Sequence, residues 1–234
     1  MRKIRLIAIV LVALGLSLPM NIASAEPDIF SPSSEPFGFK FREWTAQWWQ
    51  FVLSFPFDVN PLLDETGERC TIGQRGPVWF LMGTVVGESK RTCSIPEGTA
   101  LLFPVINSVD VNVTNQTAKE LRSELAPCLD AVRDLSVEVD GKPIRKFKLK
   151  NHSRVRSEVF EVTLPEGNVF GLAPGSYSPA VDDGYYVMLE PLAVGKHTLH
   201  FGGSSAPSAA CIFYPDGFSV DVTYSLDIVP VSLK

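Results

Sequence analysis

Residues 218–229 alternate apolar and polar side chains with a period of two. The apolar positions are Phe218, Val220, Val222, Tyr224, Leu226 and Ile228, and serine, threonine or aspartate stands between them. Since successive side chains of a strand point to opposite faces, this pattern predicts a sheet with one buried and one solvated face. Turn-bounded segments at 136–141, 155–164, 185–190 and 196–201 precede it. The sequence therefore predicts a mainly β fold, a β-sandwich of jelly-roll or immunoglobulin-like type.

Two continuous apolar runs, at 78–86 and 99–106, are typical of strands covered on both faces. Between later strands, Asp140-Gly141 predicts a hairpin turn. Asp182-Asp183-Gly184 is as easily a further turn as a part of a calcium site.

Two helices complete the expected fold. On a helical wheel for residues 39–55, the apolar stripe consists of Trp44, Trp48, Phe51, Val52 and Phe55, and Trp49 lies off it. Residues 117–132 carry leucines at helical spacing behind a capping box formed by Thr117 and Glu120. Pro127 is expected to kink or split this second helix.

The first 25 residues predict a secretory signal peptide. Three basic residues precede an apolar run at 6–18, and Ala23-Ser24-Ala25 offers a cleavage site before Glu26. The alternative, a membrane anchor, is disfavoured because a bilayer span needs roughly 20 apolar residues, so no transmembrane segment is expected after cleavage. Residues 26–38, with three prolines, predict a flexible segment ahead of a single domain at 39–234.

Cleavage also changes the charge of the chain. The leader holds three basic and no acidic residues, so its removal lowers the formal net charge from −5 to −8. An acidic chain lacks the basic surface that neutralises phosphates, and nucleic acid is therefore not an expected partner. Export predicts a periplasmic or secreted protein.

Export makes the cysteines candidates for disulfides, because these bonds persist in oxidising compartments. Cys70, Cys93, Cys128 and Cys211 permit three pairings. We favour Cys70 with Cys93, which flank the 78–86 run, and this leaves Cys128 with Cys211. Loop closure predicts about 3 and 4 to 5 kcal/mol of stabilisation from the two bonds. No pair has the C-x-x-C spacing of many metal sites.

Several motifs carry a resemblance. They are Trp44-x-x-x-Trp48-Trp49, Asn60-Pro61-x-x-Asp64, Gly73-Gln74-x-Gly76-Pro77-Val78-Trp79-Phe80-Leu81 and Arg91-Thr92-Cys93-x-Ile95-Pro96-x-Gly98. In these motifs the chain resembles a group of functionally uncharacterised exported bacterial proteins. The segment 183–201, together with 222–224, is similar in a general way to immunoglobulin-like modules of secreted proteins. The resemblance implies export and β-architecture and supplies no catalytic residues.

Four residues are candidates for ligand binding: Trp49, Gln74, Asn107 and Asp110. An exposed Trp49 would offer a stacking face for sugar rings, whereas the alternative is that the tryptophans only form the core. The other three lie at the ends of predicted strands, where loops on a rigid scaffold hold binding groups. Their alternative role is to cap turns through side-chain hydrogen bonds to nearby backbone.

Metal and cofactor chemistry has little support. The Asp110-x-Asn112-x-x-Asn115 spacing hints at a calcium loop but lacks the glycine and the glutamate that such loops need. His197 and His200 are three apart on a predicted strand and project to opposite faces. The chain has no H-E-x-x-H, G-x-S-x-G, P-loop or dinucleotide fingerprint, so we expect no metal and no cofactor.

The sequence therefore predicts an exported, non-catalytic binding or envelope-associated protein, whose partner is a glycan or an envelope protein. The alternative is a secreted hydrolase of glycosidase type that uses carboxylates brought together by loops. An exposed Trp49 beside Gln74 or Asn107 would favour binding. Two carboxylates about 5 to 10 Å apart in a cleft would favour hydrolysis.

Overall fold

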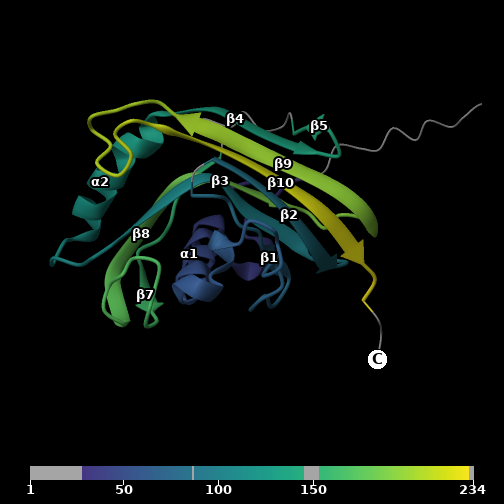
Figure 1. Cartoon of the computed structure of the whole chain (residues 1–234), viewed down its shortest axis with the longest axis horizontal. Helices are drawn as coiled ribbons and strands as arrows, with labels where there is room; N and C mark the ends of the chain where they lie inside the picture. Colours follow the sequence, from purple (N-terminus) through teal and green to yellow (C-terminus); the bar gives the residue numbers. More distant parts are fainter. Residues whose placement is uncertain (1–27, 86, 145–152, 232–234) are drawn as a thin grey trace, which may run out of the picture.

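The computed structural model describes residues 28–85, 87–144 and 153–231, so the predicted signal peptide at 1–25 lies outside the described residues. Two sheets pack face to face, with one helix against the first sheet and another at one end (Figure 1). The strands are β1 (Val78–Phe80), β2 (Gly87–Pro96), β3 (Ala100–Val111), β4 (Val132–Val139), β5 (Lys142–Pro143), β6 (Arg154–Arg156), β7 (Phe160–Leu164), β8 (Gly175–Leu189), β9 (Gly195–Ser205) and β10 (Phe218–Val229), and the α-helices are α1 (Phe41–Leu53) and α2 (Ala118–Asp130). The prediction of a mainly β sandwich is confirmed.

The two sheets share one apolar core. The first sheet has the order β1-β3-β8-β6, with β7 also paired to β8, and the second has the order β2-β10-β9-β4-β5. Stacked rings of Phe103 and Phe201, with centroids 4.6 Å apart, join the sheets. In β10 the predicted alternation holds, since Val220 and Val222 are buried and Asp221 between them is exposed.

Helix α1 covers the outer face of the first sheet (Figure 1). It is somewhat shorter than the predicted 39–55 and begins after Lys40, whose backbone N–H donates to Glu43. Trp48 is fully buried, and its indole N–H donates to the carbonyl of Leu81 at 3.0 Å. Because α1 covers one face and the second sheet the other, β3 is a nearly continuous apolar run.

Helix α2 has the predicted capping box of Thr117 and Glu120. The expected split at Pro127 does not occur, and the helix continues to Asp130. The proline removes the donor to the carbonyl of Ser123, an exposed residue whose carbonyl is open to solvent, so the cost of the lost bond is small. No helix within the described ranges has the length and apolar content needed to cross a membrane.

Both favoured disulfides are present. Cys70 pairs with Cys93, and Cys128 pairs with Cys211. The first ties the loop before β1 to β2, and the second ties α2 to the loop between β9 and β10. Bonds of this kind form and persist in oxidising compartments.

Three strand predictions need correction. The run at 78–86 is a strand only to Phe80, because the chain then leaves the sheet and the N–H of Met82 donates to the hydroxyl of Tyr224. The segment 155–164 is divided between β6 and β7. Asp182-Asp183-Gly184 is no turn but the buried middle of β8, where polar partners from other elements offset the cost of burying the two aspartates.

The described part of the segment 26–38 makes contacts with the domain. Ile29 forms a bridge to Leu189, and the N–H of Phe30 donates to the carbonyl of Met188. The indole of Trp44 donates to the carbonyl of Pro36. These bonds hold residues 29–36 against β8 and α1 despite their proline content.

Candidate functional site

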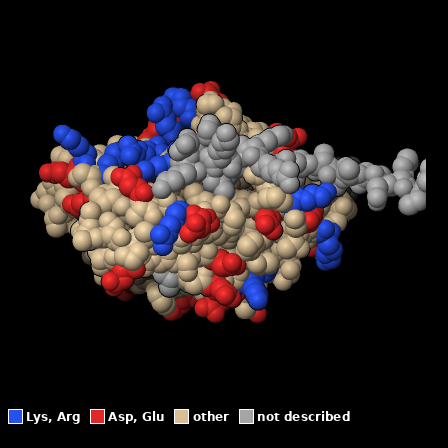
Figure 2. Space-filling model, turned by 90° about the horizontal axis from the view of Figure 1, so that it is seen from above, with Lys and Arg blue, Asp and Glu red and all other residues tan. Residues whose placement is uncertain are grey.

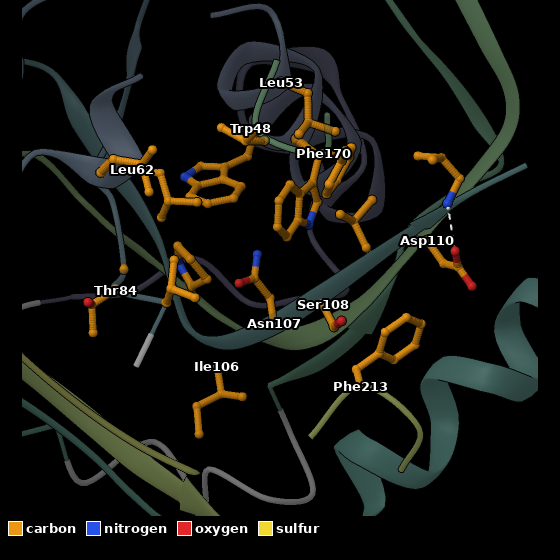
Figure 3. A pocket seen from close by; sticks show the side chains of 18 of the residues that line it. Trp48, Leu53, Leu62, Thr84, Ile106, Asn107, Ser108, Asp110, Phe170 and Phe213 are labelled. Atoms are coloured by element: carbon orange, nitrogen blue, oxygen red, sulfur yellow. Dashed lines mark hydrogen bonds between the residues drawn. The ribbon is translucent and has the colours of Figure 1, made fainter. Parts of the chain in front are cut away.

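A cleft of about 620 Å³ lies beside β3, between the end of α1 and the loops that follow β1, β7 and β9 (Figure 3). Most of its lining is apolar and includes Trp48, Trp49, Leu53, Leu62, Phe170 and Phe213. Among the described residues, Asp110 is the one carboxylate in the lining, and no lysine, arginine or histidine contributes to it. The cleft is therefore suited to an apolar ligand with few polar groups.

The cleft exists because β3 is longer than β1, the strand that pairs with one of its edges. The parallel ladder between β1 and β3 ends at Phe80 and Leu102, whereas β3 continues to Val111. A bulge between Pro104 and Ile106 marks the change. Beyond it, one edge of β3 faces the cleft without a strand partner in the described ranges.

A chain of hydrogen bonds lies behind the inner wall of the cleft and joins two of its lining residues, Trp49 and Asn107. The Asn107 amide donates to the Tyr186 hydroxyl at 2.7 Å, and Tyr186 donates to Asp182 Oδ1 at 2.7 Å. The indole N–H of Trp49 donates to the same oxygen at 2.8 Å. Gly184 makes this possible, since a Cβ there would lie 2.5 Å from the Cβ of Asn107. The chain of bonds thus links β3, β8 and α1.

Burial is the main cause of the shifted pKa values of Asp182 and Tyr186. It raises the pKa of Asp182 to about 8, against the opposing effect of the hydrogen bonds from Tyr186 and Trp49. Burial, together with the charge of Asp182, also raises the pKa of Tyr186 well above its usual value. Asp182 is fully buried. Burial therefore favours its neutral form, and the group is out of reach of a ligand.

Asp110 lies at the far end of the cleft, toward α2 (Figure 3). Its Oδ1 accepts the N–H of Val111 at 2.9 Å, and its Oδ2 is buried with no partner among the described residues. Burial raises its pKa to about 6, the bond from Val111 lowers it, and Glu124 on α2 raises it further. Asp110 thus interacts with a second acid, Glu124, which lies outside the lining and accepts a hydrogen bond from the Gln116 amide at 2.9 Å.

Arg91 supports the opposite wall. Its buried guanidinium donates to the carbonyls of Leu62, Asp64, Met82 and Gly83. Leu62 and Gly83 line the cleft. A single cation from β2 therefore fixes the two loops that form this wall. The same bonds use most of the five N–H donors of the guanidinium.

The four sequence candidates have different fates. Trp49 is buried, with 8% of its surface exposed, so the expectation of an exposed stacking face is wrong, because the indole turns inward to Asp182. Trp49, Asn107 and Asp110 all line the cleft. Gln74 lies outside it, and its amide exchanges two hydrogen bonds with the backbone of Phe80, at 2.8 and 2.9 Å.

Sequence reasoning missed Tyr186, Asp182 and Arg91. The first two were hidden because the register between β3 and β8 cannot be read from either strand alone. Arg91 occupies a buried position in β2, where exposed and buried side chains alternate. A charged residue is not expected at a buried position, so the alternation was not recognised from the sequence.

The two histidines in the described ranges, His197 and His200, lie away from the cleft, on β9. His197 contacts Asp140 at 2.9 Å, and His200 contacts Asp221 at 3.1 Å. Figure 2 shows acidic and basic side chains interspersed on the face seen from above, which is typical of a solvated surface. Within the described ranges, no group of three histidine, cysteine or acidic side chains is placed to hold a metal ion.

No protein-family model and no curated protein matches the chain. The chain does match a solved structure, that of PbICP-C in complex with falcipain-2. That match has 9% identity and a TM-score of 0.27, and it covers 66% of this chain and all of the other. So low a TM-score carries no argument about function. The fold and the cleft define only a class, a disulfide-bonded β-sandwich with an apolar cleft at a strand edge.

Proposed function

We propose that the protein is an exported, non-catalytic binding protein that holds an apolar segment of an envelope protein in the cleft. One observation carries the proposal. Of the twelve large apolar side chains that are exposed in the described ranges, five line the cleft: Phe57, Val85, Val113, Phe170 and Phe213. Exposed apolar surface gathered at one concave place is typical of an interaction site.

The predicted leader and the two disulfides support a periplasmic or secreted location. The resemblance to exported bacterial proteins points the same way.

A protein ligand has better support than a glycan. Sugar binding depends on flat aromatic faces combined with many hydrogen bonds to hydroxyl groups. The indole N–H of Trp49 is already used by Asp182, and the lining offers few other polar side chains.

The hydrolase alternative has one observation in its favour, the pair of acids Asp110 and Glu124. Glu124 raises the pKa of Asp110, so the two carboxyl groups interact, but Asp182 is sealed from the cleft. Turnover of chromogenic glycosides that is abolished by Asp110→Asn would establish hydrolysis and overturn the binding proposal.

Two valines at the cleft test the binding proposal. The full chain is expressed for export, purified in oxidised form, and offered an apolar dye (anilinonaphthalene sulfonate), a peptide array and a glycan array. We expect dye and apolar peptides to bind, and Val113→Asp or Val85→Asp to weaken both by about tenfold or more. Val194→Asp, at an equally exposed valine outside the cleft, is the matched control.

Glycan binding without peptide binding would contradict the proposal. So would peptide binding that Val113→Asp and Val194→Asp affect equally.

A further inference from the structure

We propose that the bound segment is an extended strand that adds to the free edge of β3 and places a basic residue beside Asp110 and Glu124. This inference rests on the proposed function and specifies the chemistry of its ligand.

The backbone of β3 offers the hydrogen bonds. The carbonyl of Leu102 points to the β1 side, where it accepts from Leu81, and the N–H of Asn112 points to the β8 side, where it donates to Pro179. Because backbone groups alternate along a strand, those of Asn107 and Val109 point away from β8 and into the cleft. No described segment pairs with them.

Both ends of this open edge are closed to a longer partner. Pro104 and the bulge after it interrupt the edge on one side. On the other side, Asp110 already accepts the N–H of Val111. A short extended segment therefore fits, and pairing of this kind is a recurring way in which sheets bind peptides.

The walls of the cleft define the side chains of the segment. The exposed ring of Phe170 lies on one side of β3, and the exposed ring of Phe213 lies on the other (Figure 3). Alternate side chains of an added strand would meet one wall and then the other. The segment is therefore expected to be apolar at successive positions, as a strand buried on both faces is.

Charge complementarity defines one end of the segment. Asp110 and Glu124 are two acids in one place, and Asp110 Oδ2 is buried without a partner among the described residues. A lysine or arginine at this end would offset one of the two negative charges and supply a donor to this oxygen. No basic residue lines the cleft to do so within the described ranges.

The test uses a capped peptide with five apolar residues between two lysines. We expect it to bind the full chain and to slow the hydrogen exchange of the Asn107 and Val109 amides by about tenfold or more. The amides of Ser108 and Asp110, which point to β8 in the same alternation, are internal controls and should not change. Unchanged exchange at Asn107 and Val109 in a saturated complex would overturn strand addition.

Two chemical variants of the peptide sharpen the test. Methylation of alternate backbone nitrogens should abolish binding in one register and spare it in the other, because only one set of N–H groups faces β3. Equal binding by both registers would overturn the pairing. Asp110→Asn should weaken the lysine peptide about fivefold and leave a peptide with glutamines unaffected, and an equal effect on both would overturn the charge match.

The outcomes separate this inference from the proposed function. If the dye binds in a manner sensitive to Val113→Asp but no peptide pairs with β3, the cleft binds ligands and the strand inference is wrong. If neither ligand depends on Val113, the proposed function itself fails. A dimer in solution that protects the same two amides without peptide would show that the edge serves a second copy, and would also overturn the inference.

Discussion

Replacing Asp182 by asparagine tests whether the acid buried behind the inner wall of the cleft is neutral. Burial raises the pKa of Asp182 from 3.8 to about 8. Between these values the folded state holds one more proton than the unfolded state, so the free energy of unfolding falls as the pH rises. One pKa unit corresponds to about 1.4 kcal/mol, so this carboxyl should remove roughly 3 kcal/mol of stability between pH 5 and pH 7.

Asparagine keeps an oxygen that accepts from Trp49 and Tyr186, but it does not titrate. Urea unfolding of the two proteins at several pH values, followed by tryptophan fluorescence, should therefore give curves that differ in slope. The difference in unfolding free energy should change by about 1.4 kcal/mol per pH unit in favour of Asp182→Asn as the pH rises. Asp58→Asn, at an exposed position, controls for the change of formal charge. Parallel curves for wild type and Asp182→Asn would show that Asp182 is ionised in the folded protein and would refute the reasoning.

Three further changes have defined outcomes. Arg91→Met leaves several buried carbonyls without donors and should lower the unfolding free energy by about 3 to 5 kcal/mol in urea titrations. Gly184→Ala places a methyl group 2.5 Å from the Cβ of Asn107 and should cost about 1 to 3 kcal/mol, seen as a lower Tm. Burial opposes the charge of His197, but Asp140 raises its pKa overall, so this stabilisation is full below pH 6.5 and is lost as the pH rises through the raised value. His197→Asn should remove that pH dependence, which amounts to less than about 1 kcal/mol in pH-resolved urea unfolding.

Features set by neighbouring residues were predictable from the sequence. The alternation in β10, the capping box of Thr117 and Glu120, and the Asp140-Gly141 turn each depend on positions a few residues apart. The disulfide pairing was also predictable, because Cys70 and Cys93 flank a single apolar run and only one other pair then remains.

Features set by register were not predictable. Asp182 and Asp183 look like a turn because two adjacent acids are rarely buried, yet Arg154 from β6 pairs with Asp183, and Trp49 from α1 pairs with Asp182. Nothing in the local pattern around β8 reveals partners that lie far away in the sequence. Asn107 and Asp110 were identifiable as candidates from the sequence. The cleft that they line was not, because it is formed by elements that are far apart in the sequence.

The buried network also explains why the cleft is apolar although its wall contains polar residues. Trp49, Tyr186 and Asn107 direct polar atoms to one another or to Asp182, so the wall presents mainly ring faces and hydrocarbon to a ligand. Satisfied polar groups cost little to cover, whereas an unpaired N–H or C=O in the same place would resist an apolar ligand. Besides Asp110, the backbone groups of β3 at Asn107 and Val109 are directed into the cleft, and a ligand that covers them must return their hydrogen bonds. An apolar ligand without a backbone of its own cannot do this, and a strand can.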